Sequence, residues 1–350
     1  METRKGGASA RKGGDVAGPV GIREVAERAG VSVGTVSNVL NKPEIVSKRT
    51  LAKVQQVIDE LGFVRNDLAR QLKMGGGTTL GMIVLNVANP FFAELAHASE
   101  AAAEQLGCTV VLGSSDQLAG REDRYIDLFE EQRVRGMLIA PLDGTTARMR
   151  RLRQRGMPLV LFDIREDGGD FCSVAMDGDA GGYLATTHLV QQGRRHIAFL
   201  GGPLHQVQDR WVGAMRACAE TSGVKLTHID TVDQTIADGT AAGDELVRMP
   251  AADRPDAVFA ANDLLALGLV QSLVRAGVRL PHDIAIVGYD DIDYAASAIV
   301  PLSTIRQPQR DLAREAVRLV LDEAADPAGH QHEHLRLPPE LVVRESSRSA

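Results

Sequence analysis

The chain has 350 residues, of which 44% are hydrophobic, so it can bury at least one large core. Its three cysteines, Cys108, Cys172 and Cys218, show no motif spacing, which argues against a disulfide framework and for a reducing compartment. No apolar run approaches the roughly 20 residues of a membrane span, and residues 1–20 lack the apolar core of an export signal. We therefore expect a cytoplasmic protein that contacts no membrane.

The net charge of −7 is unevenly distributed along the chain. Residues 1–76 contain 13 Lys and Arg against 8 Asp and Glu, so the remaining residues are strongly acidic. A small basic head on a large acidic body indicates that only the head meets a polyanion such as nucleic acid. A chance skew of the charges is the alternative interpretation.

Residues 1–20 are rich in glycine and predict a flexible tail. A first helix is predicted over residues 22–29, because its apolar residues recur at the spacing of one helix face. Gly30 can take the backbone conformation that ends this helix, and Ser32 is a good N-cap for a second helix over residues 33–40. Val36, Val39 and Leu40 can then turn inward, which leaves small and polar side chains facing out.

A third helix is predicted between its cap Ser47 and the closing Gly62, with Leu51, Val54, Ile58 and Leu61 on one face. Three short helices with a tight turn between the first two are typical of a helix-turn-helix domain. The small polar face of the second helix would allow close approach to base edges in a major groove. The alternative is an ordinary three-helix cap on a larger domain.

A short helix is predicted after Asn66, with Leu68 and Leu72 four residues apart and a triple glycine at residues 75–77 behind it. One interpretation is a plain linker helix. The other is a hinge that becomes ordered on DNA and inserts one apolar side chain into a minor-groove step.

The head and this segment resemble the DNA-binding head and hinge of the lactose-repressor/galactose-repressor (LacI/GalR) family of bacterial transcription regulators. The resemblance rests on Val25-Ala26, Ala29-Gly30-Val31-Ser32, Thr35-Val36-Ser37, Val39-Leu40-Asn41, Leu61-Gly62-Phe63, Asn66 and Ala69-Arg70-Gln71-Leu72. It implies base contacts for Val33, Gly34 and Asn38, phosphate contacts for Thr35 and Ser37, and insertion of Leu72 at the operator centre. The full set of predicted DNA-binding residues is Ser32, Val33, Gly34, Thr35, Ser37, Asn38, Asn41, Arg70 and Leu72.

Two positions of the head depart from the family pattern. Gly21 replaces the usual capping threonine before the first helix, and Arg65 replaces the usual proline before the hinge. The first change is expected to weaken a helix cap, and the second to loosen the hinge or add a phosphate contact.

From Thr79 onward, apolar strand-like runs alternate with amphipathic helical ones. Strands are expected within residues 80–85, 108–113, 136–141, 158–163, 196–202, 256–262, 283–291 and 303–308. Helices are expected over residues 91–106, 122–134, 180–192, 210–220 and 263–276. This alternation predicts an α/β, doubly wound core of parallel sheets covered on both faces, and the number of strands favours two lobes.

Polar residues gather where these predicted strands end, and ligands of such sheets bind beyond the carboxyl ends of the strands. Asn89, Asp163, Asn262, Asp290 and Gln307 all follow strands in this way. Amides and carboxylates suit a hydroxyl-bearing ligand, with an aromatic ring to cover its apolar face and an arginine as a forked donor. Each Asp or Asn taken singly is more simply a helix cap or turn residue.

Residues 80–345 resemble the effector-binding core of the same family, which has the two-lobed fold of periplasmic sugar-binding proteins. The matching positions are Asn89-Pro90-Phe91-Phe92, Gly136, Gly201-Gly202-Pro203, Arg210, Gly213, Ala261-Asn262-Asp263, Ala266, Gly268, Gly288-Tyr289-Asp290-Asp291 and Thr304-Ile305-Arg306-Gln307-Pro308. The predicted effector-binding residues are Asn89, Phe91, Phe92, Asp163, Arg210, Asn262, Asp290 and Gln307. Ile164, where the family often has arginine, and Leu204, at a position that is polar in several relatives, leave the identity of the effector open.

The sequence contains no GxGxxG, GxxxxGK[ST] or HExxH motif and no nucleophile turn, so we expect neither an enzyme nor a cofactor. His330, His332 and His334 occupy alternate positions. On a strand they would share a face, as metal ligands can, but a solvated loop is the commoner explanation. We therefore assign no metal site.

These observations predict a dimeric DNA-binding transcription regulator, a repressor whose affinity for a palindromic operator is controlled by a small polar effector such as a sugar. The predicted domains are a flexible tail (1–20), a helix-turn-helix domain (21–64), a hinge and linker (65–77) and an effector-binding and dimerisation domain (78–346). A sugar-binding protein without a regulatory role, such as a transport receptor, would explain the body but not the head. An enzyme of the doubly wound class is the third alternative.

Overall fold

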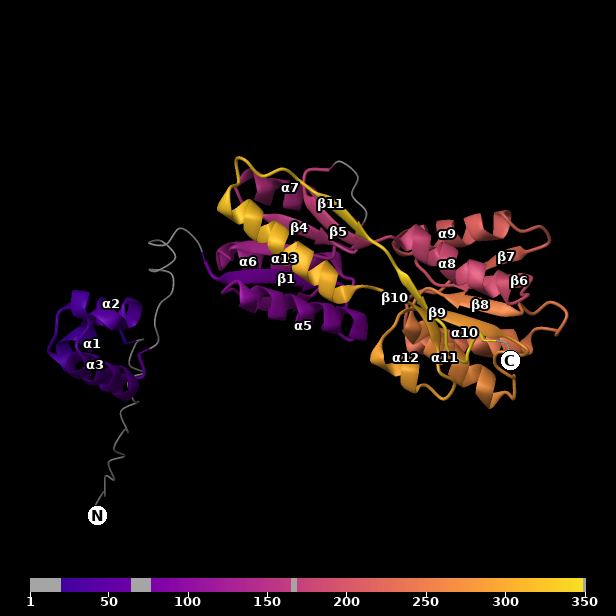
Figure 1. The fold of residues 1–350 in the computed structure, drawn as a ribbon, viewed down its shortest axis with the longest axis horizontal. Helices are drawn as coiled ribbons and strands as arrows, with labels where there is room; N and C mark the ends of the chain where they lie inside the picture. Colours follow the sequence, from indigo (N-terminus) through magenta and orange to yellow (C-terminus); the bar gives the residue numbers. More distant parts are fainter. Residues whose placement is uncertain (1–19, 64–76, 165–168, 349–350) are drawn as a thin grey trace, which may run out of the picture. The chain divides into compact units, whose positions relative to one another are not determined.

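The computed structural model describes residues 20–63, 77–164 and 169–348. The chain forms two compact units, Met1–Gly76 and Gly77–Ala350, whose elements are shown in Figure 1. The predicted tail and the hinge residues Asn66, Arg70 and Leu72 lie outside the described residues. Within the described part, no helix combines the length and the apolar character that crossing a membrane requires.

The first unit consists of short helices whose ends are set by local signals. These helices are α1 (Ile22–Ala29), α2 (Val33–Asn41), the 3-10 turn η1 (Pro43–Ile45) and α3 (Lys48–Leu61). Ser32 Oγ accepts a hydrogen bond from the backbone N–H of Thr35 at 3.0 Å, and Ser47 Oγ accepts one from Thr50 at 3.2 Å. Both predicted N-caps are therefore confirmed.

Gly30 and Gly62 end α1 and α3 in the left-handed conformation, each with a φ of 61°, which glycine adopts without steric cost. Gly21 forms no side-chain cap for α1, as its replacement of threonine predicts. The core of this unit buries Val25, Ala26, Ala29, Val36, Val39, Val54 and Val57. Val57 is an addition to the predicted face of α3, whereas the predicted Leu51, Ile58 and Leu61 are only half-buried.

The second unit contains two lobes, and the first is a six-stranded parallel sheet in the order β11-β5-β4-β3-β1-β2. Its strands are β1 (Thr79–Val84), β2 (Thr109–Ser114), β3 (Gly136–Ile139), β4 (Leu159–Phe162), β5 (Cys172–Met176) and β11 (His334–Leu337). Its helices are α5 (Pro90–Gln105), α6 (Ala119–Glu131), α7 (Ala147–Gln154) and α13 (Gln309–Ala325). Helices α5 and α13 cover one face of the sheet, and α6 and α7 cover the other.

The second lobe is a six-stranded sheet in the order β12-β10-β9-β8-β6-β7, parallel except for the antiparallel edge pair β10 and β12. Its strands are β6 (His196–Leu200), β7 (Lys225–Ile229), β8 (Ala257–Ala260), β9 (Ala285–Asp290), β10 (Ser303–Arg306) and β12 (Glu340–Val342). Its helices are α8 (Gly178–Gln191), η2 (Leu204–Gln206), α9 (Gln208–Ala219), α10 (Ile236–Arg248), α11 (Asp263–Arg275) and α12 (Asp293–Ser297).

The eight predicted strands are all present, and β5, β7, β11 and β12 are additional. β7 is an edge strand without buried residues, and β11 and β12 are short and half-exposed, so none of them has the continuous apolar run that reveals a buried strand. Helices α7, α10, α12 and α13 are likewise additional.

The chain passes between the lobes after β5, after β10 and after β11. In Figure 1, α13 returns to the first lobe and β11 follows it there, although both come from the last part of the sequence. The carboxyl ends of the inner strands of both sheets consequently meet at one cleft, and this arrangement positions the polar residues that follow those strands.

Candidate DNA-binding surface and effector cavity

The exposed surface of α2 and its cap consists of small and polar residues. Ser32, Val33, Gly34, Asn38 and Asn41 are exposed, and Val33 retains 42% of its accessible surface. The other two predicted members of this surface, Thr35 and Ser37, are half-buried because each lies at the boundary with the core. Within the described residues, this face of α2 therefore carries no side chain larger than valine or asparagine, and the backbone of α2 can approach another molecule closely.

Two asparagines on this surface differ in their surroundings. Asn41 Nδ2 donates a hydrogen bond to the Ser37 carbonyl at 2.8 Å, so its side chain is turned back onto the helix. Within residues 20–63, the side chain of Asn38 forms no hydrogen bond. The amide of Asn38 is accordingly available to pair with adenine or another partner in a groove.

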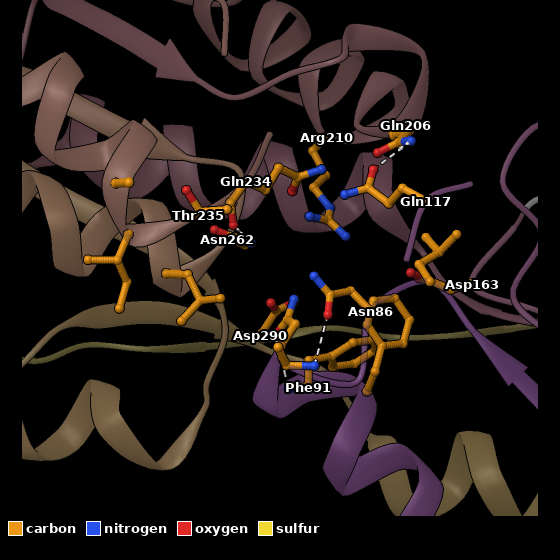
Figure 2. A pocket seen from close by; sticks show the side chains of 17 residues that line it. Asn86, Phe91, Gln117, Asp163, Gln206, Arg210, Gln234, Thr235, Asn262 and Asp290 are labelled. Carbon is orange, nitrogen blue, oxygen red and sulfur yellow. Dashed lines mark hydrogen bonds between the residues drawn. The ribbon is translucent and has the colours of Figure 1, made fainter. Parts of the chain in front are cut away.

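A cavity of about 360 Å³ lies between the lobes at the carboxyl ends of the strands (Figure 2). Its polar lining comes from both lobes and consists of Asn86, Asn89, Gln117, Asp163, Gln206, Arg210, Gln234, Thr235, Asn262 and Asp290. Its apolar lining consists of Leu85, Ala88, Phe91, Phe92, Ile236, Ala237 and Leu264. A volume in this range, with a few convergent polar groups, is typical of a small-molecule site.

Seven of the eight predicted effector-binding residues line this cavity, namely Asn89, Phe91, Phe92, Asp163, Arg210, Asn262 and Asp290. Gln307 does not line it. Its side chain is buried, and its Nε2 donates a hydrogen bond to Asp290 Oδ1 at 2.7 Å. Gln307 therefore positions Asp290 from behind instead of facing the cavity.

Sequence reasoning missed five polar lining residues: Asn86, Gln117, Gln206, Gln234 and Thr235. Asn86 comes two residues after β1 and follows the strand-end pattern that identified its neighbours. Gln117 and Gln234 lie in loops, Thr235 caps α10 and Gln206 ends the 3-10 turn η2, where glutamine and threonine are too common to stand out in a single sequence.

Asn89 and Asn262 are both helix caps and cavity residues. Asn89 Oδ1 accepts from the N–H of Phe91 at 3.1 Å, and Asn262 Oδ1 accepts from the N–H of Leu265 at 2.8 Å. Asn262 Nδ2 in turn donates to the Gln234 carbonyl at 3.1 Å. The capping interpretation and the site interpretation are thus compatible, because each cap fixes one end of an amide that lines the cavity.

Arg210 is held in place by its neighbours in the second lobe. Its guanidinium carbon lies 3.9 Å from the centre of the Tyr289 ring, and Nη1 donates to the Ala261 carbonyl. The backbone of Arg210 on α9 packs directly against Gly182 of α8. A Cβ at Gly182 would come within 2.0 Å of the Arg210 carbonyl oxygen, so this close packing of the two helices requires glycine there. Figure 2 shows the side chain entering the cavity from above Asp290.

Burial dominates the electrostatics of the two cavity carboxylates. It raises the pKa of Asp290 to about 7, although Arg210 and the Gln307 hydrogen bond oppose the shift. Burial likewise raises the pKa of Asp163, again against the attraction of Arg210. For Arg210 itself, burial disfavours the charge, but Tyr289, Asp290 and Asp163 together raise the pKa of the guanidinium.

The backbone is in the left-handed region at three non-glycine residues of the cavity. Gln117 has a φ of 55°, Asp163 of 52° and Asp290 of 114°. Such conformations cost on the order of 1–3 kcal/mol each and persist where the surrounding structure over-determines them. Their gathering around one cavity is typical of a functional site.

Comparison with known proteins identifies both units. Residues 21–66 match the family described as "Bacterial regulatory proteins, lacI family", and residues 186–347 match the "Periplasmic binding protein-like domain". The HTH-type transcriptional repressor PurR of Photobacterium profundum is 33% identical over 330 residues, which cover 93% of this chain and 98% of PurR. The chain belongs to the LacI family of bacterial regulatory proteins.

Solved structures support the same assignment for this LacI-family chain. The lac repressor dimer bound to operator and the anti-inducer ONPF matches with a TM-score of 0.80 and 29% identity, over 95% of this chain and 100% of that one. The complex of the transcriptional regulator CelR with cellobiose matches with a TM-score of 0.68 and 31% identity, over 93% and 99%.

These findings confirm the predicted fold, a helix-turn-helix head with a two-lobed doubly wound core. They also confirm the predicted function, because the protein is a DNA-binding repressor controlled by a small-molecule effector. Its partners are thus operator DNA and a small molecule. Members of the family are transcriptional regulators, which argues against the transport and enzyme alternatives.

Proposed function

We propose that this LacI-family repressor binds a palindromic operator as a homodimer, and that a sugar or related polar metabolite in the cavity changes its operator affinity. The observation that supports the effector class is the lining of the cavity, which combines six amide side chains with two carboxylates and Arg210. Adjacent sugar hydroxyls both donate and accept hydrogen bonds, and an amide side chain can likewise accept through its oxygen and donate through its nitrogen.

Phe91 and Phe92 supply the apolar part of such a site. Their ring centres lie 5.1 Å apart in an edge-to-face arrangement, and both side chains are largely buried in the first lobe. The edges and faces that reach the cavity can cover the C–H surface of a sugar ring while the polar residues contact its hydroxyls. Gln307 contributes indirectly in this proposal, by fixing Asp290.

The DNA-binding part of the proposal assigns α2 to the major groove. Val33, Gly34 and Asn38 would contact base edges, and Ser32, Thr35, Ser37 and Asn41 would contact the phosphate backbone or its immediate surroundings. Arg70 and Leu72, in the hinge proposed for residues 65–77, would contact the minor groove, with Leu72 as the inserted side chain.

Two-fold symmetry of the protein matches two half-sites in the DNA, so residues 78–346 would provide the dimer contacts as well as the effector cavity. Coupling between the sites is reciprocal: an effector that weakens operator binding must itself bind less tightly to the operator complex. We further propose that the chain is cytoplasmic and that it regulates by binding alone, without turnover of its effector or a cofactor.

The experiment that tests this function has two stages. First, a thermal-shift screen of the purified chain against sugars, including cellobiose and ribose, and against nucleobases identifies the ligand that raises its melting temperature. Second, operator sequences are selected from random DNA, and their affinity is measured with and without that ligand. A palindromic selected site and a change in affinity are expected. Binding of nucleobases alone would overturn the sugar assignment, and a non-palindromic site would overturn the dimer.

A further inference from the structure

A cluster of three side chains lies at the opposite end of the first sheet from the effector cavity. Cys172 Sγ lies 3.0 Å from His330 Nε2 and 3.6 Å from His332 Nδ1. All three atoms lie within 4.8 Å of one another. Among the described residues, these three side chains form the one group of His, Cys, Asp or Glu whose donor atoms converge closely enough to hold a metal ion.

The fold brings these residues together across more than 150 positions of sequence. Cys172 begins β5, and the two histidines lie in the segment between α13 and β11, which returns to the first lobe and pairs with β5. Ser173 of β5 pairs with His334 of β11. The backbone N–H of Glu333 donates a hydrogen bond to Cys172 Sγ at 3.4 Å, which holds the segment over the thiol. The cluster is therefore built on a sheet edge and is not a chance meeting of surface loops.

The separations fit the coordination geometry of zinc. Zn–S bonds of about 2.3 Å and Zn–N bonds of about 2.0 Å at a tetrahedral angle place sulfur and nitrogen roughly 3.5 Å apart. The two observed sulfur–nitrogen distances, 3.0 and 3.6 Å, lie on either side of this value. We propose that Cys172, His330 and His332 form a binding site for a borderline-soft divalent cation, with Zn²⁺ as the expected ion.

The surroundings leave room for the ion and its remaining ligand. His330 and His332 are half-buried and line a cavity of about 410 Å³, which Glu323 and Arg153 also line. Glu323 is buried and accepts a hydrogen bond from the Leu159 N–H at 3.4 Å, so water is the expected fourth ligand of a tetrahedral ion. Arg153 would repel a cation, but its Nη1 is paired with Asp170 Oδ1 at 2.8 Å.

The competing explanation is a hydrogen bond from the Cys172 thiol to His330. The sulfur can in addition accept an N–H from His332, so hydrogen bonding alone can account for both sulfur–nitrogen contacts. A metal requires instead a thiolate and two histidine nitrogens without a proton, so binding of a metal through the sulfur distinguishes the two explanations. The ion would tie β5 to the segment that precedes β11, the strand from which the chain crosses to the second lobe at residues 338–339.

The test uses the full-length chain without an affinity tag, stripped of metal by a chelator and kept reduced. Co²⁺ is titrated as the spectroscopic probe, because a cysteine thiolate on Co²⁺ gives a charge-transfer absorption in the near ultraviolet that histidine and water do not give. Zn²⁺ is then added to displace it. We expect saturation at one Co²⁺ per chain, full displacement by Zn²⁺ and a higher melting temperature with Zn²⁺.

The decisive variants are Cys172→Ser and His332→Gln, with Cys108→Ser and His334→Gln as matched controls. Cys108 is a second buried cysteine, and His334 lies on the same segment but contacts Ser173 Oγ instead of the cluster. The first two should weaken metal binding by more than the roughly 10–100-fold that loss of an outer-shell partner costs. The controls should bind as the unmodified chain does.

Three results would overturn the proposal: no charge-transfer band, a band that persists in Cys172→Ser, or equal losses in the decisive and control variants. If Cys172→Ser fails to fold, His332→Gln provides the same test, since this half-buried side chain lies on the surface segment. None of these measurements involves the effector cavity or DNA, so the outcome is independent of the function proposed above.

Discussion

Gln206 Nε2 donates a hydrogen bond to Gln117 Oε1 at 3.2 Å and thereby joins the two lobes beside the effector cavity. Gln117 lies in the loop after β2 of the first lobe, and Gln206 ends η2 of the second (Figure 2). A second contact between the lobes, from His205 Nε2 to Asp143 Oδ1 at 3.6 Å, has both side chains largely exposed. Polar contacts that water can replace thus join the two lobes on this side of the cleft.

Removal of either glutamine should weaken effector binding modestly. A neutral hydrogen bond contributes about 0.5–1.5 kcal/mol, so Gln117→Ala and Gln206→Ala should each lower effector affinity by up to about tenfold. If the contact acts as a unit, the double variant should lose little more than either single variant. Calorimetric titration of all four proteins measures this coupling, and fully additive losses would show that each glutamine contacts the effector separately.

Asp290→Asn should reduce effector affinity by about ten- to a hundredfold, because a hydrogen bond to a charged group contributes roughly 1.5–3 kcal/mol. The substitution keeps the shape of the side chain and turns one acceptor into a donor. Operator affinity without effector should survive, since the head is a separate compact unit. Wild-type effector affinity in the variant, measured by calorimetry, would show that Asp290 is only a turn residue.

Effector affinity should fall as the pH drops through about 7, the raised pKa of Asp290 in the free protein. Below that pH the carboxyl is protonated and loses acceptor capacity, so affinity should decline by up to about tenfold per pH unit. The free energy of unfolding of the effector-free protein should change in the opposite direction with pH. Since the folded pKa exceeds the ordinary 3.8, stability from this group is complete below about pH 4 and is lost as the pH rises through about 7.

Titrations one unit above and one unit below neutrality measure this dependence, with thermal unfolding of the free protein at the same pH values. Asp290→Asn is the matched control, because an amide does not titrate in this range. A pH dependence that remains in this variant would assign it to another group.

Asn38→Ala should cost roughly 1–3 kcal/mol of binding free energy on the selected operator and little on random DNA, since its amide is available to pair with a base edge. Gln56→Ala is the matched control: it removes an amide of the same unit whose Nε2 already donates to Glu60 Oε1 at 2.7 Å on α3. Fluorescence anisotropy with both DNAs measures the effect. Equal weakening on both would move Asn38 to a phosphate contact or a structural role.

Gly34→Ala should leave the head folded and yet impair operator binding. A Cβ at Gly34 would contact only Ser32 Oγ, at an unstrained 3.6 Å, and alanine should stabilise α2 by about 0.5–1 kcal/mol. If the backbone of α2 lies against the DNA, the added methyl group should weaken the operator complex by about tenfold, or ~1.4 kcal/mol. A stable variant with full operator affinity would place Gly34 away from the interface.

The sequence by itself determined the DNA-binding head and the architecture of the core. The caps Ser32 and Ser47 and the helix-ending Gly30 and Gly62 act on backbone groups within a few residues, so their effect can be deduced from neighbours along the chain. The cavity was predictable in part for a similar reason. Residues that directly follow parallel strands, such as Asp163 and Asp290, must reach the same edge of a sheet.

Only the tertiary structure decided which distant residues meet. Gln307 follows a strand as Asp290 does, yet it packs behind that carboxylate, because the adjacent strands β9 and β10 place one side chain in front of the other. The histidines near residue 330 suggested a solvated loop until the return of β11 to β5 set two of them against Cys172. Such contacts depend on the order of strands in a sheet, which a pattern confined to neighbouring residues does not specify.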